Sequence, residues 1–345
     1  MTMPEPPDYL PTATLARLQL RARLLQVVRR FFDRRGYFEV DTPLLSHDRV
    51  VDPHLEPFAV DAGRDALYLQ TSPEFGMKRL LAAGAQAIYQ VGHVFRAGEL
   101  GRLHNPEFTM VEWYRTGDTH LEQMQVVEDL VVEVFRAAAK AFDSEPPVSS
   151  KALPQPQVPR VPFLRTTYRE SFVRYAGCDV LPLAAADLAE LARARQISIL
   201  ESLDPADRDG WLNLLLAELV EPELGKSRPE FLCDYPASQA ALARLRQGEF
   251  PVAERFELYI AGIELCNGYH ELTDPAEFRR RIEVESQRRI GEGHSPLPVS
   301  NRLLAAMDAG LPPCAGVALG FDRLVMLAAG AKSLAEVIPF AFERA

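Results

Sequence analysis

Apolar residues first recur at helical spacing between residues 14 and 35. They fall every three or four positions, as one face of an α-helix requires: Leu15, Leu18, Ala22, Leu25, Val28 and Phe32. The opposite face is rich in arginine, which is typical either of a solvated surface or of a docking face for an acidic partner. Gly36 follows, and glycine commonly ends a helix in the left-handed conformation. The pattern predicts a helix over 14–35, preceded by an N-terminal tail at 1–13.

After Gly36, short runs of β-branched and aromatic residues alternate with longer helical patterns. The runs that predict strands in this half are 38–40, 56–60, 67–70, 87–95 and 108–115. A helix is predicted from Ser72 and Pro73, a typical helix start, to Gly84, and another over 121–142. A proline-rich loop is predicted at 143–162.

The second half begins with an alanine- and leucine-rich pattern at about 166–224, which predicts a helical insertion. The elements predicted after it are strands at 231–234, 253–271 and 316–319, and helices at 275–291, at 301–310 and from Phe321 onward. Strands, a helical insertion and then strands again favour a single α+β domain over 14–345, built on a mostly antiparallel sheet flanked by helices.

Composition narrows the class of protein. Of the 345 residues, 47% are hydrophobic and 25% are charged, as in globular proteins, and no apolar run approaches the roughly 18 residues of a membrane span. The N-terminus is proline-rich and acidic, unlike a secretion signal, so we expect a cytoplasmic protein. The formal net charge of -10 argues against tRNA, a partner bound largely through its phosphates.

Three segments far apart in the sequence carry the chemistry. The first, 36–45, is a helix end that runs into a short strand ending on proline. The second, 94–114, is two strands joined by a charged loop, and the third, 316–324, is a strand that leads into a helix. Together they resemble motifs 1, 2 and 3 of the class II aminoacyl-tRNA synthetases, and residues 104–110 are similar to the lysyl-tRNA synthetase branch. The resemblance extends from about residue 15 to residue 345.

This resemblance implies a class II synthetase catalytic domain, but nothing in the sequence matches the anticodon-binding barrel of lysyl-tRNA synthetases. The chain therefore looks like the paralogues that attach (R)-β-lysine to a lysine of elongation factor P. The resemblance implies an ATP-dependent, AMP-forming ligase with Mg²⁺, with (R)-β-lysine or lysine as substrate, elongation factor P as acceptor and a homodimer built through 36–45. The alternatives are a truncated lysyl-tRNA synthetase that charges tRNA and a non-catalytic paralogue with a regulatory role.

Residues of the second and third motifs match the nucleotide site of this family. By resemblance, Arg96 contacts the α-phosphate of ATP, Arg323 lies near the γ-phosphate, and Phe108 stacks on adenine. Lysyl-tRNA synthetases have an acid at the position of Gly98, so Glu99 is the candidate to replace it. The other nucleotide-binding positions that the resemblance implies are His104, Asn105, Glu257, Leu258 and Gly320. Attack of a carboxylate on the α-phosphate requires mainly positioning and positive charge. By resemblance, Arg96, Arg323 and Glu264 are the expected catalytic residues.

Three glutamates are spaced by seven residues: Glu257, Glu264 and Glu271. On one straight strand they would alternate between its two faces. A two-residue turn at 261–262 would instead form a hairpin in which Glu264 faces Tyr259 and shares a face with Glu257, and a bulge at Gly268 would return Glu271 to that face. Clustered carboxylates require a cation between them, so Glu257 and Glu264 are predicted to bind Mg²⁺. The alternative is that the glutamates alternate along a solvated edge strand.

The amino acid substrate is expected in an acidic pocket. By resemblance, the residues that would line it are Ser72, Pro73, Glu74, Tyr114, Glu264, Asn267, Glu271 and Ala318. Converging carboxylates favour a positively charged, lysine-like side chain and disfavour aspartate, which also argues against an aspartate–ammonia ligase. Ala318 stands where lysyl-tRNA synthetases usually have glycine, and its methyl group could displace an α-amino group in favour of a β-amino group. The alternative is a neutral packing change.

Cysteine and histidine spacing gives no further metal site. The four cysteines lie far apart, without a C-x-x-C pair. His104 belongs to the second motif, and the remaining histidines show no metal-ligand spacing: His47, His54, His93, His120, His270 and His294. The sequence therefore predicts metal binding by the glutamates alone.

Overall fold

The structure, a computed structural model, describes residues 9–50, 55–61, 63, 66–144, 157–200, 202–291 and 300–345. Most of the tail expected at 1–13 and most of the loop expected at 143–162 lie outside these ranges, as do His54 and His294. None of the described helices combines the length and the hydrophobicity that crossing a bilayer requires.

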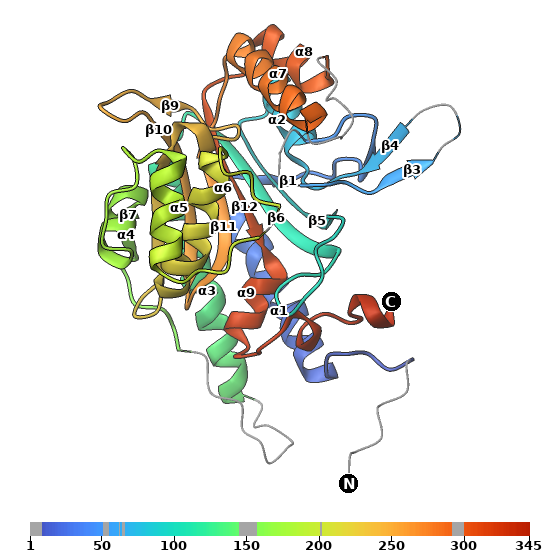
Figure 1. The fold of residues 1–345 in the computed structure, drawn as a ribbon. Coiled ribbons are helices and arrows are strands. Elements are labelled where there is room, and N and C mark those ends of the chain that lie inside the picture. Colours follow the sequence, from blue (N-terminus) through green and yellow to red (C-terminus); the bar gives the residue numbers. More distant parts are fainter. Residues whose placement is uncertain are drawn as a thin grey trace.

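One large sheet organises the molecule (Figure 1). Its strands follow the order β1-β5-β6-β12-β11-β10-β8-β7, and β9 pairs with β10. The strands are β1 Phe38–Glu39, β5 Ala87–Phe95, β6 Glu107–Thr116, β7 Leu164–Thr167, β8 Glu230–Pro236, β9 Leu245–Arg246, β10 Val252–Ile260, β11 Ile263–His270 and β12 Cys314–Gly320. Only the pairs β1 with β5 and β7 with β8 are parallel among these neighbours. The predicted α+β class with a mostly antiparallel sheet is confirmed.

A smaller sheet contains β2 (Leu45–Ser46), β4 (Ala66–Leu69) and β3 (Ala59–Asp61), in that order. The strand expected at 56–60 is wrong in its first part, because residues 56–58 have no regular structure. Pro57 lies in this part and has no backbone N–H to donate to a neighbouring strand.

Helices α1 (Leu15–Asp33), α3 (His120–Ser144) and α9 (Phe321–Ala328) cover one face of the large sheet. Their apolar faces pack on the sheet around the fully buried Trp113 of β6. Gly36 has a φ of 77° just after α1, which confirms the left-handed helix end expected there.

The segment expected as a helical insertion contains α4 (Tyr168–Tyr175), α5 (Ala185–Ala194) and α6 (Arg208–Leu215), followed by a π-helical turn at Leu216–Val220. These helices bury an apolar cluster of their own against β8 and β10. The end of α6 is thereby held beside the strands that carry the candidate site.

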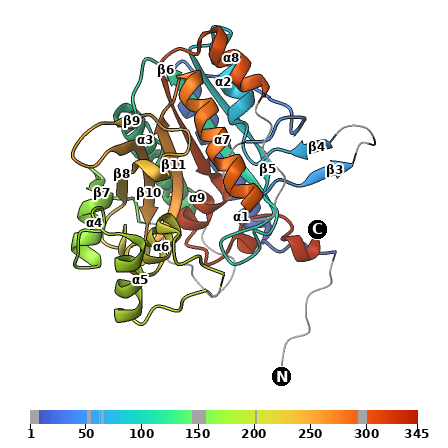
Figure 2. The same cartoon turned by 45° about the horizontal axis from the view of Figure 1, so that its top comes forward.

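Helices α2 (Glu74–Ala82), α7 (Pro275–Gly291) and α8 (Arg302–Gly310) gather at one end of the large sheet, as Figures 1 and 2 both show. The first of these helices begins at Glu74, slightly later than expected. Pro73 is therefore the N-cap rather than the first helical residue, and the expected serine cap is wrong by one position. The Ser72 hydroxyl, just before the cap, accepts a hydrogen bond from the Glu74 N–H at 3.0 Å.

The arginine-rich face of α1 is largely engaged within the molecule. Arg21 pairs with the buried Asp322 at 2.6 Å, and Arg29 pairs with Glu39 at 2.9 Å. Two further arginines near the end of the helix pair with acids of α3. These ion pairs favour a structural role for this face over docking of an acidic partner.

Candidate active site

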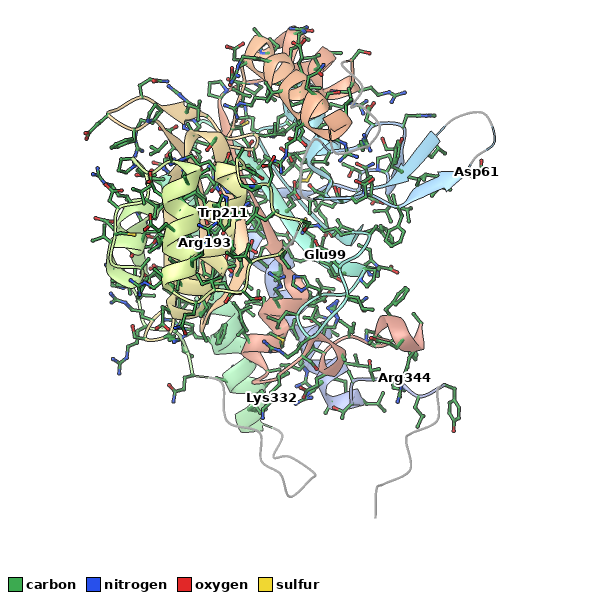
Figure 3. All side chains as sticks on the ribbon, in the orientation of Figure 1. Asp61, Glu99, Arg193, Trp211, Lys332 and Arg344 are labelled. Atoms are coloured by element: carbon green, nitrogen blue, oxygen red, sulfur yellow. The ribbon has the colours of Figure 1, made fainter. Side chains whose placement is uncertain are left out.

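A cavity of about 600 Å³ lies on the face of the large sheet opposite α1, α3 and α9. Strands β6, β10, β11 and β12 line it, together with the start of α2, the end of α6 and the loop between β5 and β6. In Figure 3, Glu99 marks that loop and Trp211 marks α6. The volume is typical of a site for small molecules.

The hairpin β10–β11 carries Glu257 and Glu264, and Glu271 directly follows it. Ala261 and Gly262 form the two-residue turn, both with positive φ, and Tyr259 faces Glu264. The register then shifts, because Leu258 faces Cys266, which leaves Leu265 as an extra residue on β11. A β-bulge at Leu265 therefore changes which residues of β11 face the cavity.

The bulge expected at Gly268 is thus wrong in position. Gly268 pairs directly with Phe256, and a Cβ there would lie 2.4 Å from the Phe256 ring, so the glycine provides room for that ring. The bulge at Leu265 brings the three glutamates to one face, as was expected of a bulge at Gly268, because Glu257, Glu264 and Glu271 all line the cavity. Strands β10 and β11 are interior, so the alternative of a solvated edge strand is wrong.

Arg96 and Phe108 lie together at one end of the cavity. The Arg96 guanidinium is 5.1 Å from the centroid of the Phe108 ring, and its Nη1 is 3.6 Å from Oε1 of Glu99. Gly98 has a φ of 80°, which a glycine adopts readily in a turn. Glu99 lines the cavity while Gly98 does not, so a carboxylate is available one position after the family's usual acid.

Arg323 is fixed at the same end by several contacts. It donates to the backbone oxygens of Glu264 at 2.8 Å and of Leu103 at 3.2 Å, and its Nη2 is 2.7 Å from Nε2 of His104. Burial, and then the charge of Arg323, lower the pKa of His104, so the neutral ring accepts this hydrogen bond. The guanidinium is therefore held in the cavity before any anion binds.

The Glu257 carboxylate is buried and has protein partners. It accepts hydrogen bonds from the hydroxyls of Tyr235 at 2.5 Å and Tyr259 at 2.7 Å, and it pairs with Arg255 at 2.5 Å. The side chain of Glu264, in contrast, is 39% exposed and lies in the cavity. Partial desolvation inside the cavity, and then repulsion by Glu257, raise the pKa of Glu264.

Glu221, which follows the π-helical turn, brings a third carboxylate to this group. Burial, and then repulsion by Glu257 and Glu264, raise its pKa to about 7. Mutually repelling carboxylates are the oxygen donors that Mg²⁺ prefers. The residues present therefore fit a Mg²⁺ ion, with Glu264 as the ligand most open to the cavity.

The other end of the cavity is a buried group of charges. Nζ of Lys78 lies 2.5 Å from a carboxylate oxygen of Glu74 and 2.5 Å from one of Glu271. Burial lowers the pKa of Lys78, but attraction by the two carboxylates outweighs it and raises that pKa above its ordinary value. Burial, with repulsion by Glu74 and Glu112, raises the pKa of Glu271 to about 8.

Glu112 of β6 is the third buried carboxylate at this end. It accepts hydrogen bonds from the hydroxyls of Ser72 at 2.8 Å and Tyr114 at 2.7 Å. Burial, and then repulsion by Glu74, raise its pKa to about 7. Three carboxylates thus surround the single ammonium of Lys78, so the group is net negative once Glu112 and Glu271 are ionised, and a cationic ligand favours those ionised forms.

Ala318 of β12 pairs with Glu112 on one side and with Asn267 on the other. Oδ1 of Asn267 is buried in the cavity wall and has no hydrogen-bond partner within the described residues. Because buried amide oxygens normally have a partner, a hydrogen-bond donor from a ligand is expected there. The Ala318 methyl group lies between this oxygen and the acidic end of the cavity.

Most of the expected site residues line this one cavity: Ser72, Glu74, Arg96, Glu99, His104, Asn105, Phe108, Tyr114, Glu257, Glu264, Asn267, Glu271, Ala318, Gly320 and Arg323. Pro73, Gly98 and Leu258 do not line it. The Leu258 side chain is buried in the core on the opposite face of β10, because it alternates with Glu257. A side-chain contact from Leu258 to a nucleotide is therefore not supported.

Sequence reasoning missed several charged residues of the cavity and its surroundings, among them Lys78, Glu112, Glu221 and Arg255. Two of them had a signal. Lys78 is four residues after Glu74 on a helix, and Glu112 is two residues before Tyr114 on a strand, so each pair shares a face. Neither signal says that the face is buried.

Comparison with known proteins identifies the family. The model of the class II tRNA synthetases (D, K and N) matches residues 8–344. Proteins named elongation factor P--(R)-beta-lysine ligase are similar over almost the whole chain. The protein of Vibrio cholerae is 42% identical over 98% of this chain and 99% of its own, and that of Klebsiella pneumoniae is 43% identical over 99% and 100%. The chain therefore belongs to the class II tRNA synthetase family of the D, K and N type, in the branch of these lysine ligases.

Proposed function

We propose that this chain activates (R)-β-lysine, or lysine, with ATP and transfers the acyl group to a lysine side chain of elongation factor P. The names and the near-complete coverage of its relatives support this reaction. The observation that carries the proposal is a single cavity with two arginines at one end and three buried carboxylates at the other. The first end suits a triphosphate, and the second suits an amino acid with two amino groups.

In the first step, a carboxylate oxygen of the amino acid attacks the α-phosphorus of ATP. An O–P bond forms, and the bond to the leaving pyrophosphate breaks, which yields the acyl-adenylate. Arg96 would stabilise charge on the α-phosphate and Arg323 charge on the leaving group, while Phe108 would stack on the adenine ring. Glu264 lies beside Arg323 and would position the reacting groups.

Mg²⁺, when bound, would neutralise phosphate charge in this step. Glu264 and Glu257 would hold the ion, with Glu221 close to both. Arg255 and two tyrosines fix the Glu257 carboxylate, so it offers its remaining lone pairs from a rigid position.

In the second step, the neutral amino group of the acceptor lysine attacks the acyl carbon. An amide bond forms, the C–O bond to AMP breaks, and the former amine loses one proton to solvent. The charge of the departing AMP would be stabilised by Arg96.

Pyrophosphate exchange tests the activation step. (R)-β-lysine and lysine should each support exchange to some degree, and aspartate should not. Arg96→Ala and Arg323→Ala should each lower exchange by about 100-fold or more, because each removes charge stabilisation in the transition state. Arg193→Ala, which alters an exposed arginine of α5, is the control and should keep full activity. Full exchange in either of the first two variants would contradict the site assignment.

We also propose that the protein is a homodimer. We propose a cytoplasmic location, because translation factors act in the cytoplasm. Support for the dimer comes from apolar side chains exposed around 36–45. Phe38 is 53% exposed, Leu44 40% and Leu45 43%, and β1 is an edge strand of the large sheet. We propose that a second copy of the chain covers these side chains.

A further inference from the structure

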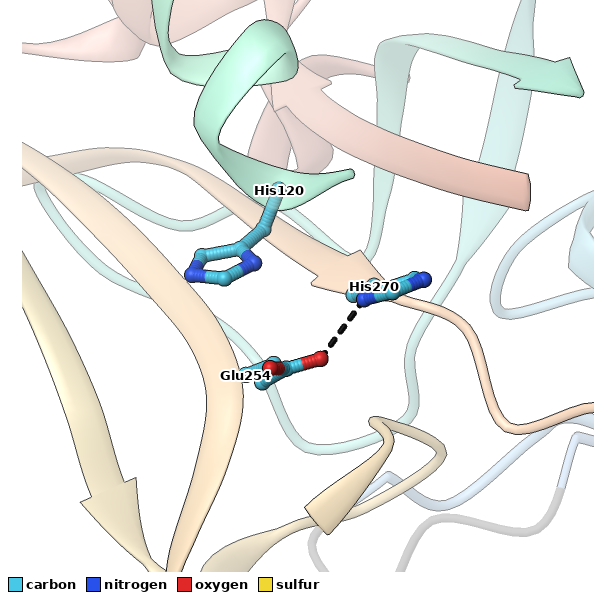
Figure 4. Close-up of side chains that lie close together, drawn as sticks. All are labelled: His120, Glu254 and His270. Carbon is cyan, nitrogen blue, oxygen red and sulfur yellow. Dashed lines mark hydrogen bonds and ion pairs between the residues drawn. The ribbon is translucent and has the colours of Figure 1, made fainter. Parts of the chain in front are cut away.

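A second polar cluster lies outside the cavity, on the other face of the hairpin β10–β11. It consists of His120 at the start of α3, Glu254 on β10 and His270 at the end of β11 (Figure 4). One ligand atom from each residue lies within 4.8 Å of the other two. None of the three lines the cavity, although His270 directly precedes Glu271, which does. Residue spacing does not reveal this group, because 150 positions separate the two histidines.

The hydrogen bonds within the cluster leave one ring nitrogen without a partner. Nδ1 of His270 is 2.6 Å from Oε2 of Glu254. His120 is only 5% exposed, and its Nδ1 is buried with no hydrogen-bond partner in the described part of the chain. In Figure 4, a ring nitrogen of His120 is turned toward His270, and the two ring centroids are 6.3 Å apart. A buried nitrogen of this kind calls for a ligand.

We propose that His120, Glu254 and His270 bind a divalent transition-metal ion of the Zn²⁺ class. Two imidazoles and one carboxylate, with a fourth position open to water, are a common zinc ligand set. Metal–ligand bonds of about 2.0–2.2 Å place tetrahedral ligand atoms roughly 3.3–3.5 Å apart. The His270–Glu254 contact would therefore open slightly and the longer separations would contract, which side-chain rotation can supply.

The charges around the cluster are compatible with a cation. Burial lowers the pKa of His120, which favours the neutral ring that a metal requires. Glu254 supplies negative charge, and Arg246 is already paired with Asp234 at 2.6 Å. Arg244 lies 3.9 Å from Glu254, but its side chain is 62% exposed and can turn to solvent when an ion binds.

An ion can reach this site from solvent. The side chains of His270 and Glu254 are 12% and 15% exposed, so the cluster is open at one side. A bound metal would tie the N-terminus of α3 to both strands of the hairpin that carries the cavity glutamates. The expected consequence is a higher melting temperature, since a ligand that binds only the folded state stabilises it.

The test uses the full-length protein without a polyhistidine tag, after treatment with a chelator and dialysis. Co²⁺ is titrated first and Zn²⁺ is then added, both in excess Mg²⁺, which competes for the carboxylate groups of the cavity. We expect one Co²⁺ per chain, with the strong visible absorption of a tetrahedral site that contains nitrogen ligands, and we expect Zn²⁺ to displace it and to raise the melting temperature. A wild-type protein that binds neither ion stoichiometrically would overturn the proposal.

Variants locate the ion. His120→Ala and Glu254→Gln should each weaken Co²⁺ binding by at least about tenfold. Loss of a residue that only hydrogen-bonds to a metal ligand already has an effect of about that size. The matched control is His93→Ala. His93 Nδ1 lies 2.5 Å from Glu107 in an exposed pair for which the described residues offer no third ligand, so this variant should bind Co²⁺ like the wild type. If His120→Ala unfolds by circular dichroism, the nearly isosteric Glu254→Gln decides. Unchanged affinity in a folded variant of either residue would contradict the assignment.

Discussion

Single residues of the acidic end make the affinity for the amino acid depend on pH. The pKa values of Glu112 and Glu271 are raised to about 7 and about 8, so the ionised fraction of both groups rises between pH 6 and pH 8. A cationic substrate favours their ionised forms. The Kd of (R)-β-lysine should therefore fall as pH rises from 6 to 8, by up to roughly tenfold per unit for each proton released. Calorimetry in buffers of different ionisation enthalpy measures both the Kd and the number of protons released on binding.

Glu112→Gln supplies the comparison for this pH dependence. The variant keeps the size of the side chain but removes one titrating group, so fewer protons should be released on binding and the slope of Kd against pH should be smaller. A Kd that does not change between pH 6 and pH 8 in the wild type would contradict the charge account of this pocket.

Ala318 is one of the two positions at which the resemblance predicts a difference from lysyl-tRNA synthetases. Ala318 lies between Asn267 and Glu112 in the strand register, and we expect its methyl group to take up space that an α-ammonium group would need. Ala318→Gly should improve activation of lysine relative to (R)-β-lysine by up to roughly 100-fold, the effect that one methyl group can have. Pyrophosphate exchange with both isomers measures this ratio, and an unchanged ratio would mean that the methyl group is only packing.

Whether a residue of the cavity could be predicted depended on how its role is encoded in the chain. Arg96, Phe108 and Arg323 could be assigned because their motifs are linear. Lys78 and Glu112 could not, because their importance depends on burial beside other carboxylates, and burial depends on which helix covers which strand. The same reason hides the cluster of His120 with His270.

At the level of elements, the hairpin β10–β11 was predictable and its bulge was only partly so. A turn at 261–262 follows from local residue types, and it determines that Glu264 faces Tyr259. The need for a bulge follows from the odd spacing of the glutamates. Its position at Leu265 does not, because packing of Phe256 against Gly268 keeps the ladder regular at the place where glycine favoured the bulge.

The hairpin places its glutamates at different ends of the cavity, so their variants should differ. Glu264→Gln should raise the KM for ATP and for the amino acid by roughly tenfold or more, since Glu264 lies beside Arg323 and Glu257. Glu271→Gln should affect mainly the KM for the amino acid, because it contacts Lys78. Steady-state kinetics over both substrates measures this, with the exposed Glu283→Gln of α7 as control. Equal effects on both substrates from both variants would indicate one undivided acidic cluster.

For the whole molecule, the sequence supported the α+β class and the family, while the order of the strands came only from the structure. Hydrophobic residues that recur every two positions identify single strands, and those that recur about every 3.6 positions identify single helices. They do not say that β12 inserts between β6 and β11, which joins the second and third motifs on one cavity floor.

The proposed homodimer is a prediction about the whole molecule. Sedimentation at micromolar concentration should give a dimer, and Phe38→Asp should weaken association by about tenfold or more, because it places a charge in an apolar contact. Val173→Asp is the matched control, since Val173 is 52% exposed on α4, far from 36–45 in the sequence. A monomeric wild type, or equal weakening by both variants, would contradict a dimer through this segment.

The most direct test of the proposed function is the identity of the acceptor. The protein is incubated with ATP, Mg²⁺ and (R)-β-lysine, together with elongation factor P and lysine tRNA in the same reaction. Intact-mass spectrometry should show elongation factor P heavier by one lysyl-type acyl group at a single lysine, and acid gels should show uncharged tRNA. Unmodified elongation factor P beside charged tRNA would contradict the account and would indicate that the chain charges tRNA.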